Sequence, residues 1–178
     1  MSEYELIKGC IEQNPQTQHL LFEQYAGKLM TVCLRYAIDG MEAEDMLQEG
    51  FVRIFNKAHQ FKFEGSFEGW MRRIVVNVCL KHLQKRKLQF KEIEIGNTNE
   101  PQLNPYAYCN LGAGELMKLI NQLPNGYRAV FNLNVIEGYS HDEIAVLLCI
   151  QPSTSRSQLV KARRLLQEQI IQLEKIAV

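Results

Sequence analysis

The chain has 178 residues, of which 46% are hydrophobic and 22% are charged, and its formal net charge is zero. This composition excludes a disordered protein, and no apolar run reaches the ~20 residues that a membrane-spanning helix needs. The first residues, MSEYELIKGC, lack the basic and apolar blocks of a signal peptide, so we expect a cytoplasmic protein.

The five cysteines and four histidines are scattered, with neither CxxC nor HExxH spacing. An odd, dispersed set of cysteines indicates reduced packing residues, not a disulfide framework or a zinc site. Glycine-rich phosphate loops and nucleophile motifs are also missing from the sequence. We therefore expect no metal, no cofactor and no enzymatic activity.

Helical periodicity predicts an all-α first domain over residues 1–88. A short helix is expected over about Glu3–Glu12, followed by a longer one with apolar residues at spacings of three and four from Leu20 to Tyr36. The next helix carries the apolar stripe Ala43, Leu47, Phe51, Ile54, Phe55 and Ala58. Ser66 then fits the N-cap of a helix with the inward residues Phe67, Trp70, Met71, Ile74, Val75 and Val78.

The periodicity disappears over residues 89–113, which are rich in asparagine, proline and glycine. A segment of this length without periodicity predicts a flexible linker between two small domains. Its beginning, FKEIEI (Phe90–Ile95), fits either a short strand or an extended segment.

Apolar periodicity returns in a second all-α domain over residues 114–178. A helix after Pro124 should end at Gly138 in the left-handed conformation. Ser140 and Glu143 fit a capping box for a helix that runs to about Cys149. A long basic helix is expected from Ser153 or Thr154, with the inward stripe Leu159, Ala162, Leu166, Ile170 and Leu173.

Charged residues are segregated along the chain although they sum to zero. The ranges Arg72–Lys91 and Arg156–Arg164 hold basic residues and no acidic one, whereas Met41–Phe51 holds acidic residues and no basic one. Such patches suit a protein that contacts DNA in two places and a protein partner in a third.

The capped helix, the short turn and the basic helix of the second domain have the pattern of a helix-turn-helix. An αα-hairpin with a solvated basic face fits the same pattern. In the DNA-binding interpretation, base edges are contacted by Ser153, Thr154, Arg156, Ser157 and Gln158, and phosphates by Lys161, Arg163 and Arg164.

Two segments of the first domain each allow two interpretations. In the first segment, aromatic residues are followed by Asn77 and a run of basic residues, a pattern that suits binding of an unpaired nucleic-acid strand. Phe67 and Trp70 also fit a hydrophobic core. Asp45, Gln48 and Glu49 share one helix face that could bind a basic protein surface. Carboxylates near a helix N-terminus can equally serve to complement the helix dipole.

Taken in order, these segments resemble the extracytoplasmic-function sigma factors of the bacterial sigma-70 family. The resemblance covers nearly the whole chain and rests on four stretches: AEDMLQEGFVRIF, GWMRRIVVNVCLKHL, LPNGYRAVFNLNVIEGYSHDEIAVLLCI and KARRLL. It implies a sigma factor that binds core RNA polymerase and directs promoter-specific transcription initiation. The main alternative is a one-component regulator, which would dimerise and bind duplex promoter DNA without polymerase.

The resemblance also implies roles for single residues. The residues implied to dock on the clamp coiled coil of the largest polymerase subunit are Asp45, Gln48, Glu49 and Phe51. The flap of the second-largest subunit is a further implied partner of the chain. Binding of the single-stranded minus-ten element of promoter DNA falls to Phe61, Lys62, Phe67, Trp70, Arg73, Asn77, Lys81, Lys85 and Arg86. The helix-turn-helix reads the minus-thirty-five element, and an anti-sigma factor is a candidate partner.

Four positions depart from the pattern usual in that family. Cys149 stands where glycine is frequent, which predicts a turn that is less strained or differently shaped. Ser155 replaces an apolar anchor of the recognition helix, Gln158 an arginine and Lys81 an aspartate. These departures leave the preferred promoter sequence open.

Overall fold

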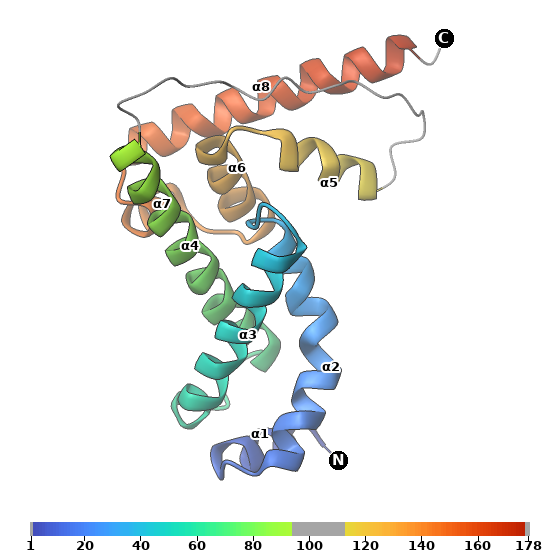
Figure 1. Ribbon diagram of the computed structural model, residues 1–178, viewed down its shortest axis with the longest axis vertical. Helices are drawn as coiled ribbons and strands as arrows, with labels where there is room; N and C mark the ends of the chain where they lie inside the picture. The colour runs from blue at the N-terminus through green and yellow to red at the C-terminus, as the bar shows by residue number, and fades with distance from the viewer. Residues whose placement is uncertain (1, 94–112, 177–178) are drawn as a thin grey trace. The chain divides into compact units, whose positions relative to one another are not determined.

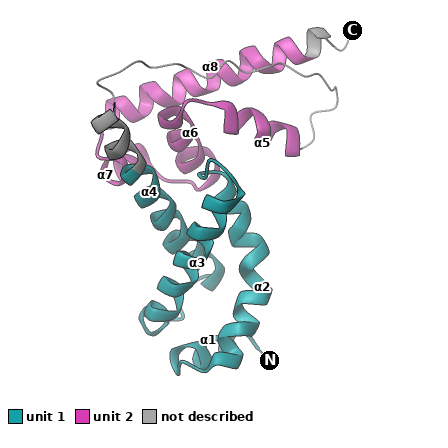
Figure 2. Ribbon diagram, in the orientation of Figure 1, with its two compact units in different colours: residues 1–87 teal, residues 88–178 magenta. Residues whose placement is uncertain are grey.

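The computed structural model describes residues 2–93 and 113–176, with side chains described for 2–85 and 114–173. Within these ranges the chain forms eight α-helices and no strand, which confirms the predicted all-α fold. The chain divides into two compact units, Met1–Lys87 and Leu88–Val178 (Figure 2). Most of the predicted linker lies outside the described residues.

Unit 1 contains the helices α1 (Glu3–Ile11), α2 (Pro15–Leu34) and α3 (Gly40–Lys57), a short 3-10 turn at Ala58–Gln60, and the part of α4 (Phe67–Ile93) that precedes the unit boundary at Lys87 (Figure 1). Each helix begins after a polar side chain that accepts a hydrogen bond from a backbone N–H of the first turn, which would otherwise be unsatisfied. These N-caps are Ser2, Asn14, Asp39 and Ser66. The N-cap predicted at Ser66 is thus confirmed.

The core of unit 1 lies between α2, α3 and α4. Fully buried side chains from all three helices meet there, among them Leu21, Leu29, Met46, Ile54, Met71 and Val75. Burial of each such side chain stabilises the fold by roughly 1.5–3 kcal/mol. Gly50 permits a close approach of α3 to α4, because a Cβ atom at this position would lie 3.0 Å from Cγ2 of Val75.

Leu21 takes the inward position of α2, whereas the adjacent Leu20 is exposed. One expectation about the end of the first domain is wrong. Residues Phe90–Ile93 continue α4 instead of forming a strand or an extended segment. The stretch KRKLQFKEI contains no proline or glycine and is rich in strong helix formers, so the helix persists after its apolar periodicity ends.

Unit 2 contains α5 (Ala113–Gln122), α6 (Asn125–Phe131), a π-helical turn at Asn132–Ile136, α7 (His141–Leu148) and α8 (Pro152–Ile176). Its core cluster consists of residues of α5 and α8 together with Leu123, which directly follows α5: Leu119, Ile120, Leu123, Ala162 and Leu166. Ile170 and Leu173 pack against this cluster in partly buried positions. Leu159 is also buried, so the predicted inward stripe of α8 is confirmed.

The two ends of α7 shape the helix-turn-helix. Gly138 has a φ of 79° and Ser140 forms a capping box with Glu143, both as predicted. At the other end, Cys149 has φ 53° and ψ 48°, the left-handed conformation that favours glycine. The prediction of a less strained turn is therefore wrong, since an L-residue in this conformation costs ~1–2 kcal/mol. Pro152 opens α8, where its fixed φ and missing N–H are tolerated.

Candidate nucleic-acid and protein interfaces

A row of exposed side chains follows one face of α4. Arg73, Asn77, Lys81 and Lys85 are spaced by four residues, which places them on one side of the helix, and all four are exposed. The helical rise gives this row a length of ~18 Å. No acidic residue lies on α4 between Arg73 and Lys85. The row can therefore follow a nucleic-acid backbone, and the predicted Arg86 lies outside the described side chains.

The aromatic residues before this row are largely buried. Phe67 has no exposed surface, and its ring lies 4.9 Å from that of the buried Phe61. A direct DNA contact by either ring does not fit this structure, because both side chains are buried. Trp70 stacks on Phe67, with 5.4 Å between the ring centroids. Because Trp70 is only half-buried, it is the one ring of these three with substantial exposed surface. Lys62 is exposed on the loop before α4.

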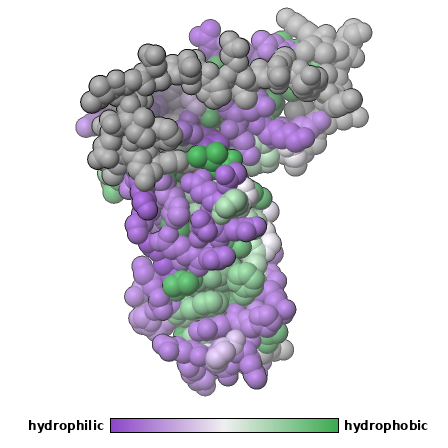
Figure 3. Space-filling view, in the orientation of Figure 1, coloured by the Kyte–Doolittle hydropathy of each residue, from purple (hydrophilic) through white to green (hydrophobic). Residues whose placement is uncertain are grey.

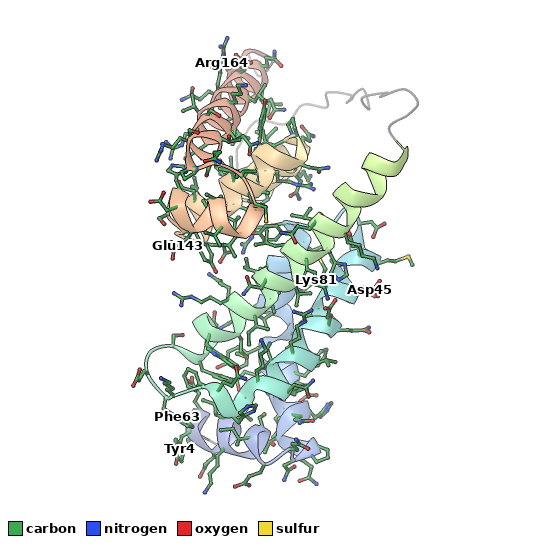
Figure 4. The ribbon with its side chains drawn as sticks, turned by 90° about the vertical axis from the view of Figure 1, so that its left-hand side faces the viewer. Tyr4, Asp45, Phe63, Lys81, Glu143 and Arg164 are labelled. Atoms are coloured by element: carbon green, nitrogen blue, oxygen red, sulfur yellow. The ribbon has the colours of Figure 1, made fainter. Side chains whose placement is uncertain are left out.

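Two further rings extend this aromatic cluster to the surface. Phe63 lies 5.4 Å from Phe61 and 5.2 Å from Tyr4 of α1, and both Phe63 and Tyr4 are exposed (Figure 4). Phe63 has a φ of 58°, which a bulky residue rarely adopts. Neither residue was among those predicted for the site, and no sequence pattern indicates a positive φ at a phenylalanine.

One face of α3 combines polar and apolar exposed side chains. Asp45 and Gln48 are exposed and form no hydrogen bond or ion pair within the described part of the chain. They share this face with Met41, which is 79% exposed, and with the exposed Val52, at helical spacings of four, three and four. Hydrophilic and apolar side chains alternate on the visible surface of unit 1 in Figure 3. Sequence reasoning missed Met41 and Val52, although their spacing to Asp45 could have identified them.

Glu49 differs from its neighbour Asp45 because it binds residues of its own domain. Its carboxylate lies 2.9 Å from Nε2 of His82, 2.5 Å from a guanidinium nitrogen of Arg53 and 3.8 Å from Nζ of Lys81. The pKa of Glu49 lies below its usual value, mainly because of the hydrogen bond with His82 and to a smaller extent because of the hydrogen bond with Arg53. Glu49 thus joins α3 to α4, and its carboxylate is only partly available to another protein.

Phe51, predicted to bind polymerase, is a core residue. It is buried, and its ring packs against that of Phe22 at 4.7 Å. Its position on the apolar stripe of α3 directs it inward, so a direct contact with a partner does not fit.

The outward face of α8 is basic. Ser153, Arg156, Ser157, Lys161, Arg163 and Arg164 are exposed, while Thr154 and Gln158 are half-buried. Arg164 binds Glu168 one turn later at 2.9 Å, whereas Arg156, Lys161 and Arg163 have no ion pair within the described residues. Val160, which sequence reasoning missed, is 66% exposed in the middle of this face.

Gln158 and Ser155 face the interior of unit 2. A Cβ atom on Gly126 of α6 would lie 3.4 Å from the amide nitrogen of Gln158, so this amide lies against α6. Ser155 is fully buried, and its Oγ lies 2.9 Å from Nδ1 of His141. A polar contact between α7 and α8 therefore occupies the place where an apolar anchor was expected.

Other kinds of site find little support in the described residues. No group of His, Cys, Asp and Glu side chains there is arranged to hold a metal ion. None of the described helices combines the length and hydropathy that crossing a lipid bilayer requires.

Comparison with known proteins gives two family matches: Sigma-70 region 2 over residues 21–89, and Sigma-70, region 4 over residues 113–166. The ECF RNA polymerase sigma factor SigE of Mycolicibacterium smegmatis is 30% identical over 154 residues, 83% of this chain but only 59% of that protein. RNA polymerase sigma-H factor of Pseudomonas aeruginosa is 25% identical, with 90% of each chain covered. The sigma factor RpoE of Bartonella quintana, solved in complex with the anti-sigma factor NepR, has a similar fold, with a TM-score of 0.55 at 20% identity, covering 85% of this chain and 95% of that one.

Proposed function

Because this chain belongs to the sigma-70 family, among the extracytoplasmic-function (ECF) sigma factors, we propose that it binds core RNA polymerase and directs promoter-specific transcription initiation. One observation carries the proposal: regions 2 and 4 of the family occur in order, and each unit bears its own exposed basic surface. In unit 1 this surface is the row on α4, and in unit 2 it is the outward face of α8.

Unit 1 is proposed to bind the opened minus-ten element of the promoter. Arg73, Lys81 and Lys85 neutralise phosphates along one strand, and Asn77 offers an amide to a base edge. Trp70 is the ring on which a base can stack, an interaction worth ~1–3 kcal/mol. Removing a base from the duplex costs a few kcal/mol, which these contacts can offset.

Unit 2 is proposed to read the duplex minus-thirty-five element with α8 in the major groove. Arg156 and Ser157, in the first turns, face base edges, and Lys161 and Arg163 contact phosphates. Val160 lies among these cations as an apolar surface, which suits the methyl group of thymine. Gln158 contributes less than predicted because its amide lies against α6.

Polymerase docking is assigned to the exposed face of α3. Asp45 and Gln48 supply polar groups, and Met41 and Val52 supply apolar area, for the clamp coiled coil of the largest subunit. A contact of unit 2 with the flap of the second-largest subunit is also proposed, as is an anti-sigma factor as a regulatory partner. The chain contributes recognition in the cytoplasm and no catalysis of its own.

The experiment that tests this function compares binding with and without polymerase. Sedimentation of the purified full chain should show a monomer that binds promoter duplex weakly alone and binds core RNA polymerase tightly. A dimer that binds duplex promoter DNA tightly by itself and has no affinity for core polymerase would establish the one-component regulator instead.

A further inference from the structure

Ser155 is a polar residue without exposed surface in the first turn of α8. Its hydroxyl oxygen lies 2.9 Å from Nδ1 of His141, the first residue of α7. The two residues are 14 positions apart in the sequence. Their hydrogen bond therefore joins the two helices of the helix-turn-helix directly, in addition to the turn that connects them.

Each partner is held in place by its own helix. His141 follows the N-cap Ser140, whose backbone N–H donates to Glu143 at 2.8 Å and whose Oγ accepts from the Glu143 N–H at 3.3 Å. The backbone N–H of Ser155 donates to the carbonyl of Gln151 at 3.0 Å. Because a hydrogen bond weakens steeply with length and misalignment, the bond between the two side chains limits rotation of α8 about its axis.

Rotation of α8 decides where its exposed side chains point. Ser155 faces α7, whereas the adjacent Arg156 is exposed, since successive residues are turned by ~100° around a helix. A side chain that ends ~5–6 Å from the axis moves by ~2 Å when the helix rotates by ~20°. Such a displacement is enough to break a bidentate contact between an arginine and a guanine.

We propose that His141 is a positioning residue for duplex recognition: its bond to Ser155 sets the rotation of α8 and so aims Arg156 at a base edge. This inference rests on the proposed function, because it requires α8 to read a promoter element. A bond with a purely structural role would contribute to stability without changing which bases are preferred.

The test measures base preference and stability separately. Holoenzyme assembled from the full chain and core polymerase is mixed with duplexes that carry a randomised minus-thirty-five element, and the bound and unbound fractions are sequenced. The readout is the binding ratio between the preferred sequence and its single-base-pair variants. Urea unfolding of each free variant measures its stability.

Four variants separate the two roles. His141→Leu and Ser155→Ala remove the hydrogen bond, whereas His141→Asn places a polar atom where Nδ1 stands and keeps a partner for Ser155. His19→Leu, at an exposed histidine of α2, is the matched control. Ser155→Ala also serves as the smaller change should His141→Leu fail to fold.

We expect the binding ratio to fall by about tenfold in His141→Leu and in Ser155→Ala, the discrimination that one misaligned base contact loses. His141→Asn should restore most of the ratio, and His19→Leu should not change it. A wild-type ratio in folded Ser155→Ala and His141→Leu protein would overturn the inference, whatever their stability. A wild-type holoenzyme with no base preference would instead contradict the proposed function.

Discussion

The carboxylate of Glu49 on α3 lies 2.9 Å from Nε2 of His82 on α4. This pair joins the helix proposed to bind polymerase to the helix proposed to bind the opened promoter strand. As a consequence, the acidic residues of α3 are not equivalent. Asp45 is exposed and has no partner among the residues that the structure describes, whereas Glu49 is engaged with residues of its own domain.

The Glu49 pair predicts a pH-dependent contribution to stability. The hydrogen bonds of His82 and Arg53 lower the pKa of Glu49, so its stabilisation is present above the unfolded-state pKa of about 4.3 and is lost as pH falls through the lower folded-state pKa. Glu49→Gln should reduce the free energy of unfolding at pH 7 by no more than ~1 kcal/mol, because the pair is partly screened by solvent. Urea unfolding measured from pH 7 down to pH 3 checks this.

The matched control is Glu44→Gln, at an exposed residue on the same helix. Its unfolding free energy should stay parallel to that of the wild type across the pH range. Identical pH profiles for Glu49→Gln and the wild type would show that the contacts of Glu49 add nothing to stability.

Substitution of Asp45 should weaken polymerase binding without changing the stability of the fold. Asp45→Ala removes an exposed carboxylate from the proposed docking face, so we expect the affinity for core polymerase to fall by about tenfold, equivalent to ~1.4 kcal/mol. The urea midpoint should remain at the wild-type value. Fluorescence titration with core polymerase measures the first quantity. A lower midpoint with unchanged affinity would show that Asp45 stabilises α3 instead of binding polymerase.

Cys149 predicts a stabilising substitution. Its left-handed conformation is strained for an L-residue, so Cys149→Gly should raise the free energy of unfolding by up to ~1 kcal/mol after allowing for the greater freedom of glycine in the unfolded chain. Cys149→Ala keeps the strain and should not stabilise the protein. Equal stability of the glycine and alanine variants would mean that the turn carries no strain.

The two basic surfaces should differ in what their cations do. Lys85→Ala should weaken holoenzyme binding by a similar factor for all promoter sequences, and the slope of log affinity against log salt should become shallower by about 1. Arg156→Ala should weaken binding most at one base pair of the minus-thirty-five element. Titrations at several salt concentrations measure both effects, and the same uniform loss for the two variants would remove the base-reading role of Arg156.

Local signals in the sequence predicted much of the fold. Gly138 and the Ser140–Glu143 capping box act over a few residues, so their conformations follow from residue type and spacing. The apolar stripe of α8 was equally readable because one helix face repeats every three or four residues. The end of α4 could not be predicted in this way, because helix propensity continues the helix beyond its last apolar contact.

The candidate site was harder to predict because it depends on contacts between helices. The distance of His141 from Ser155, and of Glu49 from His82, arises from packing that residue spacing does not encode. Phe51 and Phe67 illustrate the same difficulty. Both fitted an inward stripe and a binding surface, and only the arrangement of neighbouring helices places them in the core.

The most direct measurement is transcription in vitro with purified components. The reaction contains the full chain, core RNA polymerase and a template that carries the minus-thirty-five element preferred by the holoenzyme. We expect transcripts from one start site, and we expect them to disappear when either the chain or the minus-thirty-five element is removed. The control is the same core polymerase with another sigma factor, which should transcribe. If that control is active and this folded chain gives no template-specific transcript, the assignment is contradicted.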